Sequence, residues 1–275
     1  MAIASINNLD FLYNNSTKHI FKNLTHHFDS SNCYVLCGRN GCGKSTLLEL
    51  LSGKRLAPSQ TISVDGFDPF RNTRVNSTVA LLNNQWGMRT VAYCGYNLPL
   101  QSSIRVCEMM KSLKSLFPER EKELRQVLKI NTQWRLNCVS EGQRKRIQLY
   151  LGLLQPFKLL LLDEITVNLD VIVKSRFMDF LKRESQKGCC VVYVTHIFDG
   201  LEEWCDRLLY MNKGNINEIE ISTIRERQTT IYDYVLQLFQ KDSGDLEHTE
   251  EKEDHSYPIS SRNAGGYSSG TLINL

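Results

Sequence analysis

The stretch GRNGCGKST, residues 38–46, decides the fold. It matches the pattern G-x-x-x-x-G-K-[ST], follows the apolar run Cys33–Cys37 and precedes the helix-forming segment LLELLSG. Glycines at this spacing let successive backbone N–H groups face a phosphate at the positive end of the following helix. A glycine-rich turn can arise by chance, but the flanking strand and helix favour a phosphate-binding loop. The predicted contacts come from Gly38, Arg39, Asn40, Gly41, Cys42, Gly43, Lys44, Ser45 and Thr46.

Individual side chains in this loop have separate predicted roles. In such loops the lysine, here Lys44, reaches the β- and γ-phosphates, and the hydroxyl of Ser45 can ligate Mg²⁺. Cys42 lies next to the amino end of the helix and close to Lys44 in sequence. Both neighbours favour the thiolate, so we expect the pKa of Cys42 to lie below the free value of about 8.5.

Two further apolar runs end in polar residues. The segment KLLLLDE predicts a strand that ends at Asp163, placed to hold Mg²⁺, followed by Glu164, placed to polarise an attacking water. A buried strand with solvated acids at its end is the alternative. The run Cys190–Val194 is followed by Thr195 and His196, again at the edge where doubly wound sheets bind ligands. A lone histidine is usually a surface or core residue, but this position favours contact with the γ-phosphate.

Two weaker candidates complete the predicted site. Gln85 follows the run Val79–Leu82 and is a candidate contact for Mg²⁺ or the attacking water, although any polar residue after a strand would give this pattern. Phe11 is a candidate for stacking on an adenine ring, with a core aromatic as the alternative.

The apolar runs and the segments between them predict an α/β fold. Continuously apolar strands, each followed by a helical pattern, are typical of a mostly parallel sheet flanked by helices. The segments Ile3–Asn7 and Thr61–Val64 are expected to be antiparallel, and residues 104–130 are expected to form a helical insertion interrupted near Pro118. We predict one domain over residues 1–240. Residues 241–275 are acidic and then rich in Ser and Gly, which predicts a tail without a folded core.

Composition excludes some classes of function. A net charge of +3 over 275 residues gives no electrostatic case for nucleic-acid binding, and the basic run QRKRIQ, residues 143–148, is interpreted as part of a helix. No window reaches the roughly 18 apolar residues that a membrane span needs. An odd count of nine cysteines at irregular spacing suggests a reducing compartment.

The stretch CVSEGQRKRIQL, which begins at Cys138, resembles a second phosphate-binding turn. Together with the loop, the DE strand end and His196, it resembles the nucleotide-binding domain of ABC-type ATPases over residues 1–220. The family signature LSGGQ is similar to residues 139–143. The resemblance implies a helical subdomain at about 96–155, a head-to-tail homodimer and two molecules of ATP with Mg²⁺ at the seam. It also implies contacts to the partner's nucleotide from Ser140, Gly142, Gln143 and Asp170.

The signature region departs from the family pattern. Val139 and Glu141 replace the leucine and the first glycine of LSGGQ, and Ile165 stands where the family has a proline. The D-loop, usually Ser-Ala-Leu-Asp, reads VNLD at residues 167–170. The retained Ser140 and Gly142 keep activity plausible, with Glu141 near a γ-phosphate as a feature that would slow or tune it.

The segments SEGQRKRIQL, LLLLDEITVNLDV, VVYVTHIFDGLEEW and VDGFDPF are similar to a narrower group. These are small stand-alone ABC ATPases whose fungal member associates with the Ccr–Not complex. The resemblance implies a soluble regulatory ATPase of gene expression, in cytoplasm and nucleus. An ATPase subunit that pairs with a separate membrane subunit and a nucleotide-sensing scaffold with little turnover remain alternatives.

Overall fold

The computed structural model describes residues 1–13, 17–83, 88–90, 97–99, 103–109, 111–167 and 169–247. The chain divides into one compact unit over Met1–Phe239 and a second over Gln240–Leu275. All elements that build the candidate site belong to the first unit.

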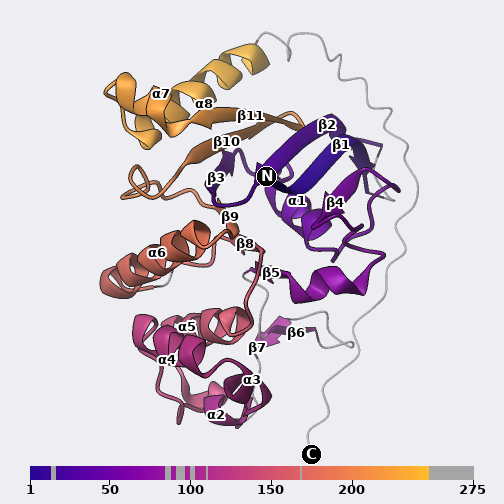
Figure 1. Ribbon diagram of the computed structural model, residues 1–275. Helices are drawn as coiled ribbons and strands as arrows, with labels where there is room; N and C mark the ends of the chain where they lie inside the picture. The colour runs from indigo at the N-terminus through magenta and orange to yellow at the C-terminus, as the bar shows by residue number, and fades with distance from the viewer. Residues whose placement is uncertain are drawn as a thin grey trace, which may run out of the picture. The chain divides into compact units, whose positions relative to one another are not determined.

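A six-stranded sheet forms the centre of the first unit (Figure 1). Its order is β11-β10-β3-β9-β8-β5, and its pairs are parallel except for the antiparallel pair β10–β11. The strands are β3 (Cys33–Gly38), β5 (Val79–Leu82), β8 (Leu159–Asp163), β9 (Cys190–Val194), β10 (Arg207–Asn212) and β11 (Asn215–Glu220). The strands predicted from the continuous apolar runs are therefore confirmed.

The central strands are apolar throughout because both faces of the sheet are covered. On β3, Cys33, Val35 and Cys37 belong to one core cluster, while Tyr34 and Leu36 belong to a second cluster on the opposite face. Period-two alternation of side chains separates the clusters in this way. The first cluster packs against α4, α5 and α6, and the second against α1 and the antiparallel sheet. Burial on both faces is what a parallel sheet flanked by helices requires.

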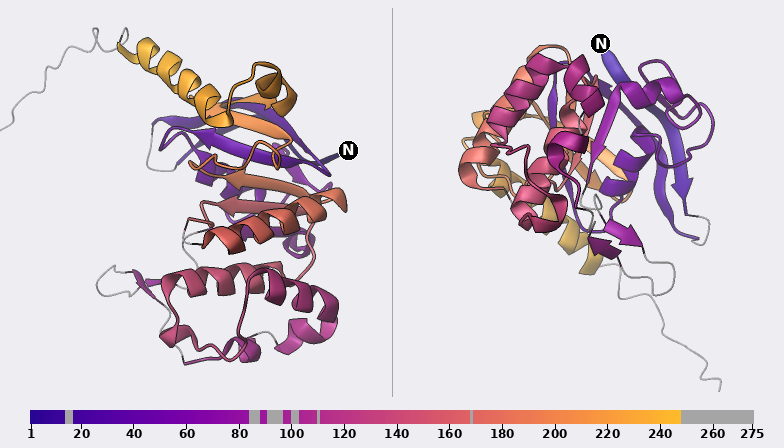
Figure 2. Two further views of the ribbon diagram at one scale, coloured as in Figure 1. Left: turned by 90° about the vertical axis from the view of Figure 1, so that its left-hand side faces the viewer. Right: turned by 90° about the horizontal axis from the view of Figure 1, so that it is seen from below.

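The helices have the following bounds: α1 (Lys44–Leu51), α2 (Val106–Met109), α3 (Lys111–Leu116), α4 (Pro118–Val127), α5 (Glu141–Leu153), α6 (Val171–Gln186), α7 (Ile221–Glu226) and α8 (Ile231–Glu247), with 3₁₀ turns η1 (Thr73–Ser77) and η2 (Leu136–Cys138). The predicted insertion at 104–130 forms three of these helices, α2 to α4. Pro118 opens α4, a position where its missing N–H is not needed. Figures 1 and 2 show α4 and α5 grouped with α2 and α3 in the helical part of this unit.

An antiparallel sheet of order β2-β1-β4 covers the α1 side of the central sheet. Its strands are β1 (Ala2–Leu12), β2 (His19–Asp29) and β4 (Ile62–Val64), and a separate hairpin pairs β6 (Met88–Thr90) with β7 (Asn97–Pro99). The two predicted antiparallel segments are confirmed, and β1 extends further than expected. It does so through a register shift between Ile6 and Leu9, where Asn8 has φ 47°.

The last described helix continues past the residue at which the polar tail is expected to begin. The polar tail is expected from residue 241, but α8 continues to Glu247. Ile231 and Val235, one helical turn apart, are buried in the first core cluster and anchor the start of this helix.

Candidate functional site

Three strand ends meet at one edge of the central sheet. The register pairs Leu36 on β3 with Val194 on β9, and Val194 with Asp163 on β8. The phosphate loop after β3, Glu164 after β8 and His196 after β9 therefore leave the sheet side by side. This is the carboxyl edge at which open α/β sheets bind ligands.

The loop between β3 and α1 depends on glycine at two positions. Gly41 and Gly43 have φ of 79° and 108°, which side chains other than glycine adopt only with strain. A Cβ at Gly43 would also lie 2.8 Å from Cγ2 of Ile20. A Cβ at Gly41 would meet no atom within 4 Å, so that residue faces open space. Helix α1 then starts without a side-chain cap, which leaves its first N–H groups available to an anion.

Lys44 is held inside this loop. It is 7% exposed, and its Nζ donates hydrogen bonds to the carbonyls of Gly38 at 2.8 Å and Arg39 at 3.0 Å. These bonds keep the ammonium beside the loop, where it would neutralise phosphate charge. A cavity of about 300 Å³ opens here, lined by Tyr13, Ile20, Asn40, Gly41, Gly43, Lys44, Ser45, Thr46 and Glu164.

The aromatic residue at the cavity is Tyr13, not Phe11. Phe11 is 8% exposed and its ring lies 6.4 Å from that of Phe21, so it takes the core role that the sequence left as the alternative. The hydroxyl of Tyr13 lies 2.7 Å from Oγ1 of Thr46. The guanidinium of Arg55 lies 4.7 Å from the centre of the Tyr13 ring. Sequence reasoning missed Tyr13, because nothing in the sequence marks it rather than Phe11 as the ring at the cavity.

Asp163 and Ser45 supply oxygen ligands of the kind that Mg²⁺ prefers. Burial raises the pKa of Asp163, the hydrogen bond from Ser45 opposes this change, and the neighbouring Glu164 adds to it. A carboxylate that is partly desolvated beside a second carboxylate gains from a divalent cation. The contact between Asp163 and Ser45 therefore fits an Mg²⁺ site.

Glu164 is positioned by an uncommon backbone conformation. Its φ is 51°, in the left-handed region, where a residue other than glycine costs on the order of 1–3 kcal/mol. The hydrogen bond from its backbone N–H to the carbonyl of Val194, at 3.1 Å, ties it to the end of β9. Such strain clusters at functional sites.

The side chains of Glu164 and His196 face each other. Oε1 of Glu164 lies 3.3 Å from Nε2 of His196, and each side chain is 38% exposed. Oγ1 of Thr195 accepts a hydrogen bond from the backbone N–H of Ile197 at 3.0 Å, which fixes the turn around His196. The structure therefore brings these two predicted residues together, next to the phosphate loop.

The signature residues form a helix start in the helical part of the unit. Oγ of Ser140 accepts a hydrogen bond from the backbone N–H of Gln143 at 3.3 Å, and Oε1 of Gln143 accepts one from the backbone N–H of Ser140 at 2.9 Å. This capping box begins α5, and Glu141 in its first turn complements the helix dipole. Among the described residues, those that line the cavity of Lys44 do not include Ser140, Gly142 or Gln143.

Other predicted residues have different positions. Oδ1 of Asp170 accepts a hydrogen bond from the backbone N–H of Val173 at 2.9 Å and caps α6. A guanidinium nitrogen of Arg39 lies 3.5 Å from the carbonyl of Phe239. Gln85, predicted as a catalytic and metal contact, lies outside the described residues, as does Asn168.

The prediction for the ionisation of Cys42 is wrong. Burial raises the pKa of this thiol above its ordinary value, and Lys44 and backbone N–H groups only partly oppose that change. The sequence indicated the nearby charge and the helix start. It did not indicate that Cys42 packs against the second core cluster.

In the part of the chain that the structure describes, no helix is both long and apolar enough to cross a membrane.

Comparisons with known proteins agree with this fold. A family model described as ABC transporter matches residues 21–167. ABC transporter I family member 20 of Arabidopsis thaliana is 41% identical over 191 residues, covering 68% of this chain and 58% of that protein. CCR4-associated factor 16 of Saccharomyces cerevisiae is 42% identical over 190 residues, covering 66% of each. The chain thus spans only part of the length of these relatives.

Solved structures show the same fold. The ATP binding subunit of an ABC transporter matches with a TM-score of 0.70 at 17% identity, covering 86% of this chain and 99% of that one. A dimeric ATP-binding cassette in a post-hydrolysis state, bound to ADP and Pi, matches with a TM-score of 0.64 at 17% identity, covering 79% and 98%. At these identities the likeness concerns the fold alone. The family match covers more than half of the sequence and includes the phosphate loop and the end of β8, so the chain belongs to the ABC transporter family of ATP-binding proteins.

Proposed function

We propose that the chain binds ATP with Mg²⁺ and hydrolyses it. The observation that carries the proposal is the contact of 3.3 Å between Glu164 and His196, at the same sheet edge as Lys44. Lys44 would bind phosphate oxygens, and Ser45 and Asp163 would hold Mg²⁺, whose charge neutralises the phosphates when it is bound. The carboxylate of Glu164 would take the proton of the attacking water, and His196 would orient that carboxylate and contact the γ-phosphate.

The seam of a head-to-tail homodimer is the proposed place of this reaction. In support, Ser140, Gly142 and Gln143 do not line the cavity of Lys44 in the described part of a single chain. A second copy would supply them. Ser140 would cap the γ-phosphate while still capping α5, because a hydroxyl accepts one hydrogen bond and donates another. Asp170, at the start of α6, would lie at the same seam.

The biological role we propose is regulation, as a soluble ATPase acting with gene-expression machinery of the Ccr–Not type in cytoplasm and nucleus. Its support is the similarity to the yeast protein named CCR4-associated factor 16. The second candidate is the ATPase subunit of a transporter with a separate membrane subunit. The similarity to proteins named as transporter subunits, such as the nickel import ATP-binding protein of Escherichia coli, supports it at 26% identity.

The test of the reaction is Glu164→Gln. This change keeps the shape of the side chain but removes its ability to accept a proton, so ATP binding should persist while turnover falls on the order of 10²–10⁴-fold. Glu119→Gln, on the exposed start of α4, is the matched control and should leave turnover unchanged. Near-normal hydrolysis by Glu164→Gln would overturn the assignment. Purification of that variant with ATP, from detergent extracts, would then separate the roles, because a stoichiometric membrane partner favours the transporter subunit.

A further inference from the structure

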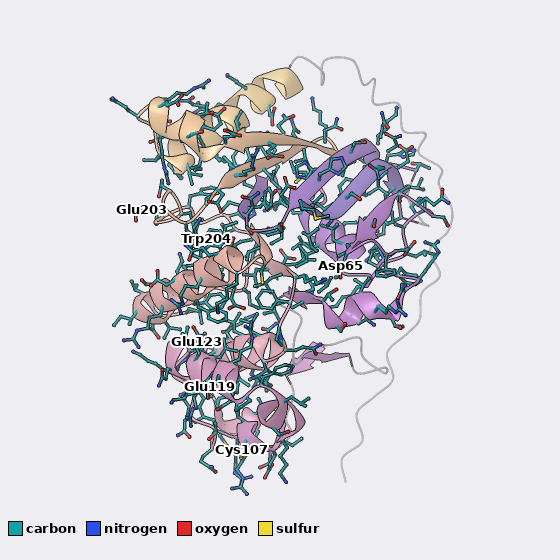
Figure 3. The ribbon with its side chains drawn as sticks, viewed as in Figure 1. Asp65, Cys107, Glu119, Glu123, Glu203 and Trp204 are labelled. Atoms are coloured by element: carbon teal, nitrogen blue, oxygen red, sulfur yellow. The ribbon has the colours of Figure 1, made fainter. Side chains whose placement is uncertain are left out.

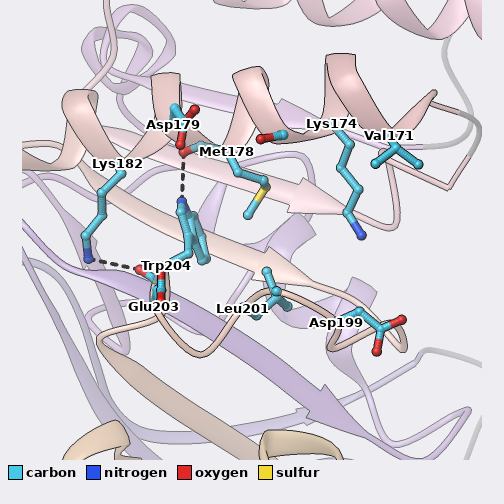
Figure 4. Close-up of a pocket in the computed structure, with 11 residues that line it drawn as sticks. Val171, Lys174, Met178, Asp179, Lys182, Asp199, Leu201, Glu203 and Trp204 are labelled. Atoms are coloured by element: carbon cyan, nitrogen blue, oxygen red, sulfur yellow. Dashed lines mark hydrogen bonds between the residues drawn. The ribbon is translucent and has the colours of Figure 1, made fainter.

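A second cavity is lined by residues that lie on both sides of His196 in sequence. Its volume is about 620 Å³, and it separates α6 from the loop that follows β9 (Figure 4). The lining residues are Val171, Lys174, Ser175, Met178, Asp179, Lys182, Asp199, Gly200, Leu201, Glu203 and Trp204. We call this cavity the α6 groove. None of these residues has a role in the proposed reaction.

The floor of the α6 groove is apolar and fixed. Met178, Leu201 and Trp204 are 8%, 1% and 5% exposed. Nε1 of Trp204 donates a hydrogen bond to the carbonyl of Met178 at 3.0 Å, and Nζ of Lys182 donates one to the carbonyl of Trp204 at 2.9 Å (Figure 4). These bonds join the two walls, so the groove exists before any partner arrives. A preformed site avoids the cost of ordering its walls on binding.

The rim of the α6 groove carries an excess of negative charge. Within the described residues, the side chains of Asp179, Asp199 and Glu203 form no ion pair, and all three are exposed. The positive charge of Lys182 is already offset by Asp206 at 2.7 Å, which leaves Lys174 as the cation of the rim. Figure 3 shows Glu203 at the outer edge of the loop, with Trp204 beside it. The electrostatic complement of this rim is a basic surface.

One end of the groove has an exposed apolar side chain. Val171 is 83% exposed at the start of α6, and Ile197 is 41% exposed directly after His196. A binding segment would therefore meet apolar contacts along the floor and at this end, and carboxylates along the rim. A helix with apolar residues on one face and basic residues on its flanks has this combination of chemistry.

We propose that the α6 groove is a docking site for a basic amphipathic segment of a partner protein. Leucine, isoleucine or methionine side chains would contact the exposed Val171 and the apolar floor of the groove, and lysine or arginine would pair with Asp199 and Glu203. The site adjoins the turn that holds His196 and the cap residue Asp170. A bound segment would therefore lie next to two elements of the proposed nucleotide seam. The proposal does not depend on ATP hydrolysis, because it rests on the groove alone.

The test uses the full chain and two synthetic peptides. One is an amphipathic helix with leucine on one face and lysine on its flanks, and the other has glutamate in place of lysine. Fluorescence anisotropy should show binding of the lysine peptide only. The double variant Asp199→Lys with Glu203→Lys should raise its Kd by about tenfold or more. The double variant Glu119→Lys with Glu226→Lys makes the same change in net charge elsewhere and should leave Kd within about twofold.

Hydrogen exchange should show that the lysine peptide protects residues 171–182 and 197–206 in the wild-type chain. Far-UV circular dichroism checks that both double variants fold. Equal weakening by the two double variants would overturn the proposal, because it would mean non-specific attraction to net charge. Sedimentation of the chain without peptide tests whether a second copy of this chain occupies the groove instead. Loss of a wild-type dimer on reversing Asp199 and Glu203 would assign the groove to a second copy of this chain and also overturn it.

Discussion

The ion pair between Arg120 on α4 and Glu184 on α6 should stabilise the contact between the helical part of the unit and the central α/β core. Nη1 of Arg120 lies 2.5 Å from Oε2 of Glu184, and Nε donates to the carbonyl of Leu153 at 2.6 Å. Glu184 is 3% exposed. Removal of one partner from a buried pair costs about 3–5 kcal/mol, because the other charge stays buried without it.

The structure indicates that the stability cost of Arg120→Met lies at the lower end of that range. Nζ of Lys187 remains 2.8 Å from the other carboxylate oxygen of Glu184, so the charge keeps one partner. The Nη2 atom of Arg120 has no hydrogen-bond partner among the described residues, so its removal breaks no hydrogen bond. We therefore expect a loss of about 3 kcal/mol in the free energy of unfolding. The double variant Arg120→Met with Glu184→Met should lose about 1–3 kcal/mol less than the sum of the single losses.

Urea unfolding followed by circular dichroism measures these losses. Arg105→Met is the control, because its pair with Glu108 at 3.1 Å is exposed and should be worth less than about 1 kcal/mol. Arg120→Met within about 1 kcal/mol of the wild type, or single losses that add fully in the double variant, would refute the reasoning.

Acid provides an independent check on the same pair. Burial alone would raise the pKa of Glu184, but hydrogen bonds from Lys187 and Arg120 outweigh it and hold the pKa below its ordinary value. A lowered pKa in the folded state gives stability that is present above the unfolded pKa, about 4.3, and is lost as the pH falls through the folded pKa. Arg120→Met should flatten this acid dependence, whereas Arg105→Met should not.

Three further predictions concern other residues. Burial lowers the pKa of His26 in the folded state, and Glu218 partly opposes this change. The free energy of unfolding should therefore fall as the pH drops below about 6.5. His26→Gln should flatten this pH dependence, whereas His27→Gln, at the exposed neighbouring position, should not. Because burial raises the pKa of Cys42, brief maleimide treatment at neutral pH should label it more slowly than the exposed Cys138, as followed by peptide mass spectrometry. MgATP should slow the labelling of Cys42 further. Faster labelling of Cys42 than of Cys138 would instead support the thiolate prediction. Ser140→Asp keeps an N-cap residue but places a carboxylate at the proposed seam. Light scattering should therefore show ATP-dependent dimers of the Glu164→Gln protein but none of the protein that also carries Ser140→Asp, while the free energy of unfolding stays unchanged. Persistent dimers would exclude the contact of Ser140 with the partner's nucleotide.

The strands of the central sheet could be predicted because burial on both faces makes them continuously apolar. The strand ends at Asp163 and Val194 then followed from the first polar residues, and the parallel order brought Glu164 and His196 to one edge. In each case the local sequence and the tertiary packing favour the same structure, which is why the prediction succeeded.

Phe11 could not be assigned because its side depends on a bulge. In an unbroken strand, alternation from the buried Ala4 and Ile6 would place even-numbered residues inside and turn Phe11 outward. The register shift after Ile6, with Asn8 at φ 47°, reverses the alternation and buries Leu9 and Phe11 instead. A bulge of one residue is hard to detect in sequence, yet it places Phe11 in the core.

Helix α6 connects the features that the sequence treated separately. It begins at the cap residue Asp170, lines the α6 groove with Lys174, Met178 and Lys182, and ends near Glu184, which binds Arg120 of the helical part. Its 16 residues span about 24 Å as one continuous helix. If the helix moves as a rigid body, the groove variants and Arg120→Met should show coupled effects on ATP-dependent dimerisation, although their side chains do not touch. Additive effects would instead assign the groove and the ion pair to independent parts of the domain.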